Sequence, residues 1–367
     1  MTIDGRGVPT RTMTATTAEA ATAAAGATTP EAAESSPTLL AGVDVGGSKI
    51  AILLADPALR AVARHVVPTG SGDGVDGVRR IVAALDATLE QVGVTRRDVA
   101  AMGIGVPGRV DPEAGTVTLA VNLGWHALPL RDELEAVLGI PVGVENDVRA
   151  AAAGLHARGE AGGVDNLAYL AIGTGISAGV VLDGRLFRGP RGLAGEIGHV
   201  VLEPNGPACR CGLDGCLEAL ASGRAIAEAA ALRIEQGPGS TIEEPVTARS
   251  VYRAAAAGDA VAGRLVERTG RYVARAIHAL VMTYDVPRVV LGGGVTRAGT
   301  VFLDPVTRGL DELRAASALA REALPVDLVE LLPPDADAGA WGGVIVARDV
   351  ATRPARPSPR GVPDGRR

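Results

Sequence analysis

The sequence predicts an α/β fold built from two related halves, and three observations lead to this prediction. Apolar runs typical of strands alternate with helical periodicities along the chain. A strand, a glycine turn and a second strand occur twice, around residues 39–54 and 170–182. A constant offset of 127 positions lays Val45, Gly46 and Asp56 on an isoleucine, a glycine and an aspartate of the second segment. Such a repeat suggests an internal duplication. The alternative is that the two segments are unrelated, because any two hairpins with glycine turns have similar sequences.

The first half begins near Thr38 with two apolar runs, 39–45 and 50–54, which a glycine pair separates. Two β-rich runs split by glycines predict a hairpin. Residues 1–37 precede it, are rich in alanine and threonine, and contain no compact apolar block. They do not resemble a signal peptide, and we expect a disordered extension.

Helices and strands then alternate up to the middle of the chain. Apolar residues recur at spacings of three and four over 75–92, which predicts a helix. Residues 99–106 and 141–144 predict buried strands, and 130–138 a short helix between them. An alanine-rich helix follows the second of these strands and extends to about Arg158.

The second half repeats the strand, glycine turn and strand at 170–182. A long helix is expected from Ala260 to Tyr284, because its apolar residues share one face. A strand over 288–291 follows, and a final helix lies near 338–350.

These elements predict two α/β domains. We expect an N-terminal domain over 38–147, completed by the final helix, and a C-terminal domain over 148–337. Residues 351–367 are rich in proline and arginine and are expected to form a disordered tail. A hydrophobic content of 47% is ample for two packed cores at this length.

Charge and composition exclude several classes of protein. The 367 residues include 42 acidic and 36 basic ones and carry a net charge of -6, which argues against a dedicated nucleic-acid-binding protein. Aromatic residues make up only 2%, too few for stacking platforms on single strands. The longest uncharged stretch near the middle, 166–182, is shorter than the roughly 20 apolar residues that span a bilayer. We therefore expect neither a nucleic acid nor a membrane as a partner.

Three glycine-rich turns that follow strands can accommodate a nucleotide. Backbone N–H groups free of neighbouring side chains, a hydroxyl and an ammonium are the groups that polyphosphates need. A carboxylate in the first turn can hold Mg²⁺ directly or through water. Each glycine turn alone is explained equally well as an ordinary reversal of the chain. The presence of all three in this order strengthens the interpretation that they bind a nucleotide. The residues are Asp44, Gly46, Gly47, Ser48 and Lys49, then Gly173, Thr174 and Gly175, then Gly292, Gly293 and Gly294.

Lys49 is the sole lysine among the 36 basic residues. A compact ammonium is a different ligand from a planar guanidinium. A position that requires a small point charge can therefore resist the replacement of lysine by arginine. Drift under a biased composition is the alternative.

A metal site is predicted from Cys209, Cys211 and Cys216, which lie within eight residues and follow His199. An odd number of cysteines so close together makes a poor disulfide framework and favours a reducing, cytoplasmic setting. One histidine and three thiolates fill all four places of a tetrahedral zinc, which makes the zinc structural. The alternative, three small buried hydrophobic residues, fits poorly because the loop is rich in glycine, proline and polar residues.

Together these motifs resemble the ROK family of bacterial sugar kinases. The resemblance covers about residues 38–350 and is most specific from Glu196 to Glu218. Ser48 stands where threonine is more usual, and it keeps the hydroxyl. The resemblance implies an actin-like ATPase-domain (ribonuclease H-like) fold, with two α/β domains around a cleft. It also implies ATP and Mg²⁺ as cofactors and a homodimer or higher homo-oligomer.

The family's roles carry over to matching residues. The three glycine turns correspond to two phosphate motifs and an adenosine motif. The catalytic aspartate corresponds to Asp147, and if zinc binds one ring nitrogen of the histidine, the other can donate to a sugar hydroxyl. The sugar-binding residues correspond to Asn146, Glu196, His199 and Glu218, with looser roles for Asn122, Gly108 and Arg109.

The chemistry of Asp147 supports a catalytic role independently of the family. A sugar hydroxyl must lose its proton as it attacks, so a carboxylate has to lie within hydrogen-bonding distance. Asp147 stands between a strand and a helix, and its alternative role is to cap that helix.

The implied reaction is ATP-dependent phosphorylation of a hexose at the 6-hydroxyl, with glucose as the favoured substrate. Kinases for N-acetylglucosamine, N-acetylmannosamine, mannose or fructose share the same contact residues. A sugar-responsive ROK regulator is a further alternative, but residues 1–37 lack the pattern of a helix-turn-helix. A silent sugar-binding protein is disfavoured because Asp147, both phosphate turns and Lys49 are all present.

Overall fold

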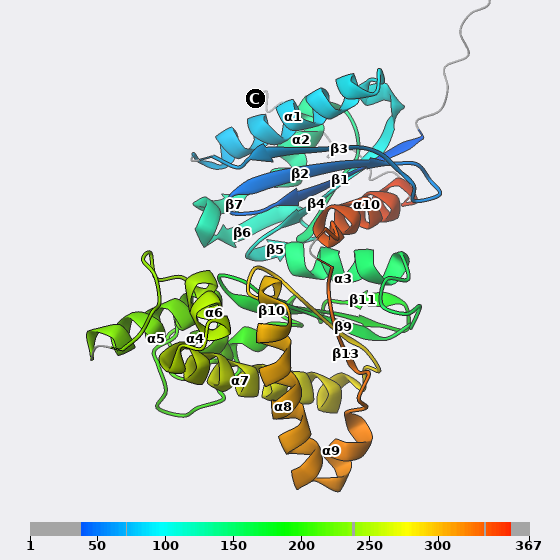
Figure 1. The fold of residues 1–367 in the computed structure, drawn as a ribbon. Coiled ribbons are helices and arrows are strands. Elements are labelled where there is room, and N and C mark those ends of the chain that lie inside the picture. Colours follow the sequence, from blue (N-terminus) through cyan, green and yellow to red (C-terminus); the bar gives the residue numbers. More distant parts are fainter. Residues whose placement is uncertain (1–37, 71, 237–238, 334, 354–367) are drawn as a thin grey trace, which may run out of the picture. The chain divides into compact units, whose positions relative to one another are not determined.

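The computed structural model describes residues 38–70, 72–236, 239–333 and 335–353 (Figure 1). The predicted extension at 1–37 and residues 354–367 of the predicted tail lie outside the described residues. None of the helices in the described ranges combines the length and the apolar character that crossing a bilayer requires.

The first half contains a five-stranded sheet of order β3-β2-β1-β4-β8. Strands β1, β2 and β3 are antiparallel, whereas β4 and β8 run parallel to β1. The predicted hairpin and the two predicted buried strands are therefore confirmed. The strands are β1 (Leu39–Val45), β2 (Lys49–Ala55), β3 (Ala61–Pro68), β4 (Val99–Val106) and β8 (Val142–Asn146).

Helices cover both faces of this sheet. Helices α1 (Gly74–Gln91) and α2 (Leu130–Leu138) pack on one face, and α10 (Ala338–Ala351) packs on the other (Figure 1). Helix α10 approaches closely because a Cβ on Gly42 would lie 2.1 Å from the carbonyl oxygen of Ala340. The final helix of the chain thus belongs to the core of the first half.

The second sheet has the order β11-β10-β9-β12-β13, with the same strand directions in the same places. The duplication suggested by the sequence is therefore confirmed in the topology. The strands are β9 (Leu167–Ile172), β10 (Ile176–Leu182), β11 (Arg185–Phe187), β12 (Val289–Gly292) and β13 (Val329–Leu331).

The constant offset of 127 positions is wrong beyond the glycine turns. Val45 pairs with Ile50 across the first turn, whereas Ile172 pairs with Ile176 across the second. The second turn is one residue shorter, so the strands that follow are shifted by one position. Asp56 consequently has no structural equivalence to the aspartate 127 positions later.

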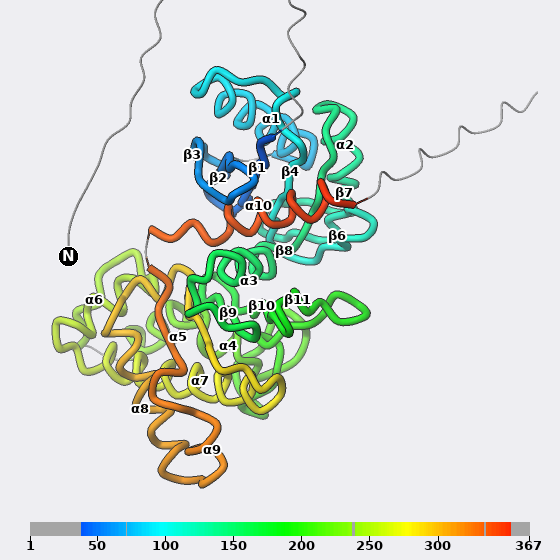
Figure 2. The backbone as a smooth tube through the Cα atoms, turned by 90° about the vertical axis from the view of Figure 1, so that its right-hand side faces the viewer, coloured from blue at the N-terminus to red at the C-terminus, as the bar shows by residue number. Residues whose placement is uncertain are grey.

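Helix α3 (Asp147–Ala157) packs on one face of the second sheet and on α10 (Figure 2). The two helices cross at glycines, since a Cβ on Gly342 would lie 2.1 Å from the carbonyl oxygen of Ala150. The opposite face of the sheet is covered by a large helical layer around α7. This layer contains α4 (Leu217–Ala221), α5 (Gly223–Glu235), α6 (Ala248–Ala256), α7 (Ala260–Tyr284), α8 (Thr300–Ala316) and α9 (Ala318–Ala323).

Several short elements were not expected from the sequence. A three-stranded sheet of β5 (Arg109–Asp111), β6 (Thr116–Ala120) and β7 (Trp125–Leu128) follows β4. These strands have three to five residues, too few for a clear alternation of apolar and polar positions. Short 3₁₀ turns lie at Arg96–Asp98, Val121–Leu123, Ile197–His199 and Thr296–Ala298.

Candidate functional site

Two carboxylates, Asp44 and Asp147, lie at the same edge of the first sheet. Asp44 is the penultimate residue of β1, and Asp147 directly follows β8. Both strands run parallel to β4, so their carboxyl ends meet at one edge. Burial raises the pKa of Asp147 to about 7, and the charge of Asp44 contributes to the increase. Burial likewise raises the pKa of Asp44 to about 6, although Lys49 opposes the shift.

The capping of helix α3 is performed by Asn146 and not by Asp147. The Asn146 Oδ1 accepts hydrogen bonds from the backbone N–H groups of Val148 at 3.0 Å and Arg149 at 3.1 Å. Asp147 is the first helical residue, and its Oδ1 accepts from Val148 N at 2.9 Å and from Asn146 Nδ2 at 3.0 Å. Within the described part of the chain, no hydrogen bond reaches Asp147 Oδ2. This oxygen is therefore the one available to accept a proton.

The loop after β4 lies against Asn146. Its Nδ2 donates to the carbonyl oxygen of Gly108 at 3.1 Å. Gly108 has a φ of 96°, and a Cβ there would lie 2.2 Å from the carbonyl oxygen of Leu119, so only glycine fits. The neighbouring Arg109 is exposed. Of these two predicted sugar contacts, Gly108 is hydrogen-bonded to Asn146, whereas the side chain of Arg109 makes no hydrogen bond or ion pair within the described ranges.

The first glycine turn leaves its tip open. Gly46 N–H donates to the carbonyl oxygen of Lys49 at 2.8 Å, and Thr69 Oγ1 donates to the carbonyl oxygen of Gly46 at 2.7 Å. Gly47, Ser48 and Lys49 are exposed. Closed at its base and exposed at its tip, the turn can present backbone N–H groups to an anion.

Asn122 lies beside this first turn, since a Cβ on Gly47 would lie 4.0 Å from Asn122 Cβ. It lines a pocket of about 300 Å³ together with Thr69, Leu123 and Trp125. Asn122 therefore lies near the first predicted phosphate turn.

The second glycine turn contacts Glu218. Gly173 N–H donates to the carbonyl oxygen of Gly175 at 2.9 Å, which closes the turn. The N–H of Ile176 donates to Glu218 Oε2 at 3.0 Å, and a Cβ on Gly175 would lie 2.5 Å from that oxygen. A predicted sugar contact and a predicted phosphate turn thus touch each other. Thr174, between the two glycines, is exposed.

The third glycine segment packs against the second. Gly293 has a φ of 99°, and a Cβ there would lie 2.4 Å from the carbonyl oxygen of Ile172. Gly292 ends β12, and Gly294 is exposed and borders a pocket of about 240 Å³. The pocket combines a floor of small and apolar side chains with three arginines and a tyrosine. Its other lining residues include Ala248, Arg249, Tyr252, Arg253, Val295, Arg297 and Val301.

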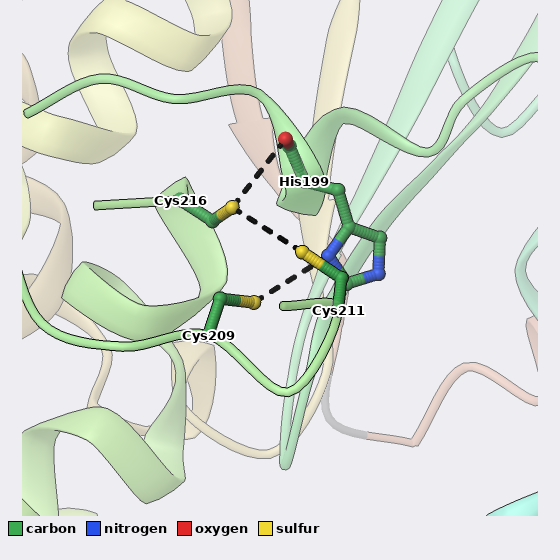
Figure 3. Close-up of side chains that lie close together, drawn as sticks. All are labelled: His199, Cys209, Cys211 and Cys216. Carbon is green, nitrogen blue, oxygen red and sulfur yellow. Dashed lines mark hydrogen bonds between the residues drawn. The ribbon is translucent and has the colours of Figure 1, made fainter. Parts of the chain in front are cut away.

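The four predicted metal ligands are gathered at one point (Figure 3). The sulfur atoms of Cys209, Cys211 and Cys216 and a ring nitrogen of His199 all lie within 4.8 Å of one another. His199 Nδ1 is 3.6 Å from Cys209 Sγ, and the Sγ atoms of Cys211 and Cys216 are 3.6 Å apart. Figure 3 shows the other ring nitrogen of His199 on the side away from the sulfurs. Donor types and spacing fit a tetrahedral site.

The metal cluster adjoins two further predicted sugar contacts. Glu196 is half-buried and precedes the 3₁₀ turn that ends at His199, whose N–H donates to the carbonyl oxygen of Glu196 at 3.1 Å. A Cβ on Gly198 would lie 3.5 Å from Glu218 Cβ. Glu196, His199 and Glu218 therefore belong to one local assembly around the metal cluster.

Sequence reasoning missed Asp337 and Tyr169. Asp337 precedes α10, pairs with Arg64 through Arg64 Nη2 and Asp337 Oδ1 at 2.7 Å, and raises the pKa of Asp44. Tyr169 of β9 is buried, and Asp147 and Asp44 both raise the pKa of its hydroxyl, after the larger effect of burial. An acidic residue at a helix start was a usable signal for Asp337, whereas a buried tyrosine in a strand carries none.

Comparisons with known proteins agree with this geometry. The model described as the ROK family matches residues 40–349. A glucokinase of Halalkalibacterium halodurans is 36% identical over 290 residues, which cover 77% of this chain and 87% of the relative. An N-acetylmannosamine kinase of Citrobacter koseri is 38% identical over 255 residues, covering 69% and 82%.

A solved structure extends the comparison to the fold. The ROK family glucokinase from Streptomyces griseus, in complex with glucose and AMPPNP, is 31% identical with a TM-score of 0.69. The match covers 85% of this chain and 99% of that chain. The actin-like α/β fold of two domains, predicted from the sequence, is confirmed by this likeness.

Proposed function

The chain belongs to the ROK family, and from this premise we propose that it is an ATP-dependent hexokinase that phosphorylates the 6-hydroxyl of glucose. The observation that supports the reaction most directly is Asp147. Among the described residues, the hydrogen bonds to its carboxyl reach Oδ1 and none reaches Oδ2, and burial raises its pKa to about 7. A group that changes charge near neutrality is suited to accept the proton of an attacking hydroxyl.

The glycine segments are assigned to ATP. The first turn, with Ser48 and Lys49 at its exposed tip, and the second turn, around Thr174, present N–H groups and cationic or hydroxyl groups to the phosphates. The pocket beside Gly294 offers an apolar floor for the base. Asp44 is placed to hold Mg²⁺, which when bound neutralises charge on the phosphates.

The sugar is assigned to the residues between these turns and the metal cluster. Asn146, Glu196, His199 and Glu218 provide donors and acceptors for ring hydroxyls. The cluster of His199 and the three cysteines fits structural zinc, which when bound fixes the loop and the tautomer of His199. We assign less specific roles at the sugar site to Asn122, Gly108 and Arg109.

Substrate choice is tested by a panel of hexoses and acetylated aminosugars with ATP, measuring kcat/KM for each. We expect glucose to give the highest value, as the glucokinase relatives suggest. N-acetylmannosamine is the second candidate, because a kinase for that sugar is 38% identical to this chain. A higher kcat/KM for the acetylated sugar would replace the first proposal with the second.

Two alternatives are separated by simple assays. A coupled assay with ATP and glucose distinguishes a kinase from a silent sugar-binding protein, which would show binding without turnover. Specific DNA binding in a gel-shift experiment would favour a sugar-responsive regulator. A homodimer in a reducing, cytoplasmic setting completes the proposal, and light scattering after size exclusion tests the oligomeric state.

A further inference from the structure

A buried ion-pair network stands directly beside the proposed base. Glu145, the residue before Asn146 in β8, has a side chain that is 1% exposed. Its Oε1 accepts hydrogen bonds from Arg149 Nε at 2.8 Å and from the backbone N–H of Asn146 at 2.9 Å. Its Oε2 pairs with Arg188 Nε at 2.5 Å. Both carboxylate oxygens are therefore used.

The two arginines come from different parts of the chain. Arg149 lies in the first turn of α3 and is 4% exposed, whereas Arg188 follows β11 and is 35% exposed. Arg149 Nη1 also donates to the carbonyl oxygen of Gly192 at 2.6 Å. The segment 188–192 is thus attached to β8 and α3 at two points.

This segment leads to a proposed sugar contact. The N–H of Ala194 donates to the carbonyl oxygen of Arg188 at 3.2 Å, and Ala178 N–H donates to the carbonyl oxygen of Gly195 at 2.7 Å. Glu196 follows immediately. The network therefore connects the turn that contains the base with the segment that presents Glu196.

Stability alone is a poor reason for such a network. Replacing a buried ion pair with well-packed apolar residues is often neutral or stabilising, whereas removing one partner is strongly destabilising. An ionic network at this place therefore suggests a requirement for charge or for fixed geometry. Asp147 is two residues from Glu145, and its Oδ1 accepts a hydrogen bond from Val148 N in the first turn of α3, the turn that also contains Arg149.

We propose that Glu145, Arg149 and Arg188 act together as positioning residues, which hold the Asn146–Asp147 turn and the segment before Glu196 in a fixed arrangement and set the electrostatic environment of the base. The proposal rests on the proposed function of Asp147. The charged and titratable groups that face Asp147 are Asp44 from β1, Tyr169 from β9 and Arg149 from α3. The positive charge of Arg149 lowers the pKa of Asp147 and so opposes the larger effects of burial and of Asp44.

Two neutral variants separate charge from packing. Glu145→Gln removes a negative charge and leaves two guanidinium groups, so we expect the pKa of Asp147 to fall. Arg188→Gln removes a positive charge and leaves Glu145 paired with Arg149 alone, so we expect that pKa to rise. Shifts of about 0.5 pH unit in opposite directions are expected. They are measured in the acidic limb of kcat/KM for the sugar, together with a kcat about tenfold lower in both variants.

The matched control is Arg96→Gln. Arg96 is 34% exposed and pairs with Asp86 at 2.5 Å, close to the values for Arg188. It precedes the start of β4, whereas Asp147 follows Asn146, which pairs with Val106 at the other end of that strand. We expect no shift of the acidic limb in this variant. Arg188→Lys, which keeps the positive charge, should restore the position of the limb and part of kcat.

A direct titration makes the test independent of turnover. The pKa of Asp147 is followed by ¹³C NMR of the labelled carboxyl in the wild-type chain and in the variants, with thermal melts to verify folding. Opposite shifts support the proposal, even for a chain that phosphorylates no sugar tested, which would contradict only the proposed function. Equal or absent shifts with lower melting temperatures would overturn it and leave a packing role.

Discussion

Glu218 accepts a hydrogen bond at 3.0 Å from the backbone N–H of Ile176, directly after the second glycine turn. The same glutamate lies in the first turn of α4, two residues after Cys216, the last of the predicted metal ligands. The loop of the predicted metal site and the second predicted phosphate turn are therefore linked through one carboxylate. Substitutions at Glu218 should therefore change the KM for the sugar and the KM for ATP.

Glu218→Gln is expected to raise KM for the sugar about 10-fold to 100-fold, because hydrogen bonds to a charged acceptor contribute about 1.5–3 kcal/mol. A smaller increase in KM for ATP should accompany it, since the amide oxygen holds Ile176 N–H less strongly. Steady-state kinetics with each substrate varied measures both. Glu267→Gln is the control, because Glu267 pairs with Arg308 at an exposed position between α7 and α8 and shares no ion-pair partner with Glu218. Unchanged sugar kinetics in Glu218→Gln would remove this residue from the sugar site.

Asp147→Asn is expected to lower kcat by about 10²-fold to 10⁴-fold, the usual contribution of a positioned base. Sugar affinity should change little, because an amide has the same shape and Asn146 continues to cap α3. Isothermal titration with the sugar and single-turnover kinetics separate the two effects. A comparable loss of sugar affinity would point to a binding role.

Activity should rise with pH through the pKa of Asp147, which is about 7. Below that pH the carboxyl is protonated and cannot accept the proton of the hydroxyl. The plot of kcat/KM against pH, with the sugar varied, should therefore show an acidic limb near neutrality. If the acidic limb of this profile lay near pH 4, where an exposed aspartate titrates, burial would not raise the pKa of Asp147 in the free enzyme.

The raised pKa of Asp147 should make the folded chain less stable as pH rises, whereas it makes activity rise with pH. A carboxyl whose pKa is raised in the folded chain favours folding when protonated, and this contribution is lost as pH rises through about 7. Asp147→Asn should therefore raise the melting temperature at pH 8 relative to the wild-type chain and leave it nearly unchanged at pH 4. Thermal melts at both pH values check this. An equal effect at the two values would contradict the electrostatic origin.

Removal of the metal should loosen the sugar site before the nucleotide site. Cys211→Ser takes away one of four donors, so we expect a steep rise in sugar KM, a lower melting temperature and little change in KM for ATP. Elemental analysis should find one zinc per wild-type chain. Leu213→Ala, an exposed position in the same loop, is the matched control. Full activity in a purified chain without zinc would contradict this assignment.

Lys49→Arg tests whether the sole lysine has a specific role. Lys49 is exposed at the tip of the first glycine turn and lowers the pKa of Asp44. An arginine keeps the charge but not the compact ammonium, so we expect KM for ATP to rise about threefold to tenfold. ATP kinetics at saturating sugar measure it. Unchanged values would attribute the lysine to compositional drift.

Some of the long, periodic elements were predicted from the sequence, whereas the helices α5 and α8 and the short strands were not. The helix from about Ala260 to Tyr284 was predicted because its apolar residues recur on one face along its length. Strand β3 was missed, since its residues alternate between exposed and half-buried and include Arg64 and His65. The clustering of the four predicted metal ligands could be foreseen because their spacing along the chain is short and their chemistry is specific.

Site residues that depend on tertiary structure could not be found in the same way. Glu145 and Arg188 are separated by 43 positions, and their pairing depends on the route of the chain after β11. Asp337 reaches Asp44 only because α10 packs back on the first sheet, where a Cβ on Gly339 would lie 2.5 Å from Asp44 Cγ. Local sequence patterns carry no information about which distant segments of the chain pack together in the fold.

The return of α10 also bears on the order in which the protein can mature during synthesis. Leu40, Ala51 and Leu53 form an apolar face that is covered by Trp341 and its neighbours. Strands β1 and β2, which carry this face, are complete by Ala55, and α10 begins at Ala338, so the ribosome makes these strands 283 residues before the helix that covers them (338 − 55). During this interval the nascent first half exposes one apolar face of its sheet. Such an exposed face can be bound by chaperones or can aggregate. A chain shortened before residue 338 should therefore be recovered with chaperones or as aggregate, and not as a shorter enzyme.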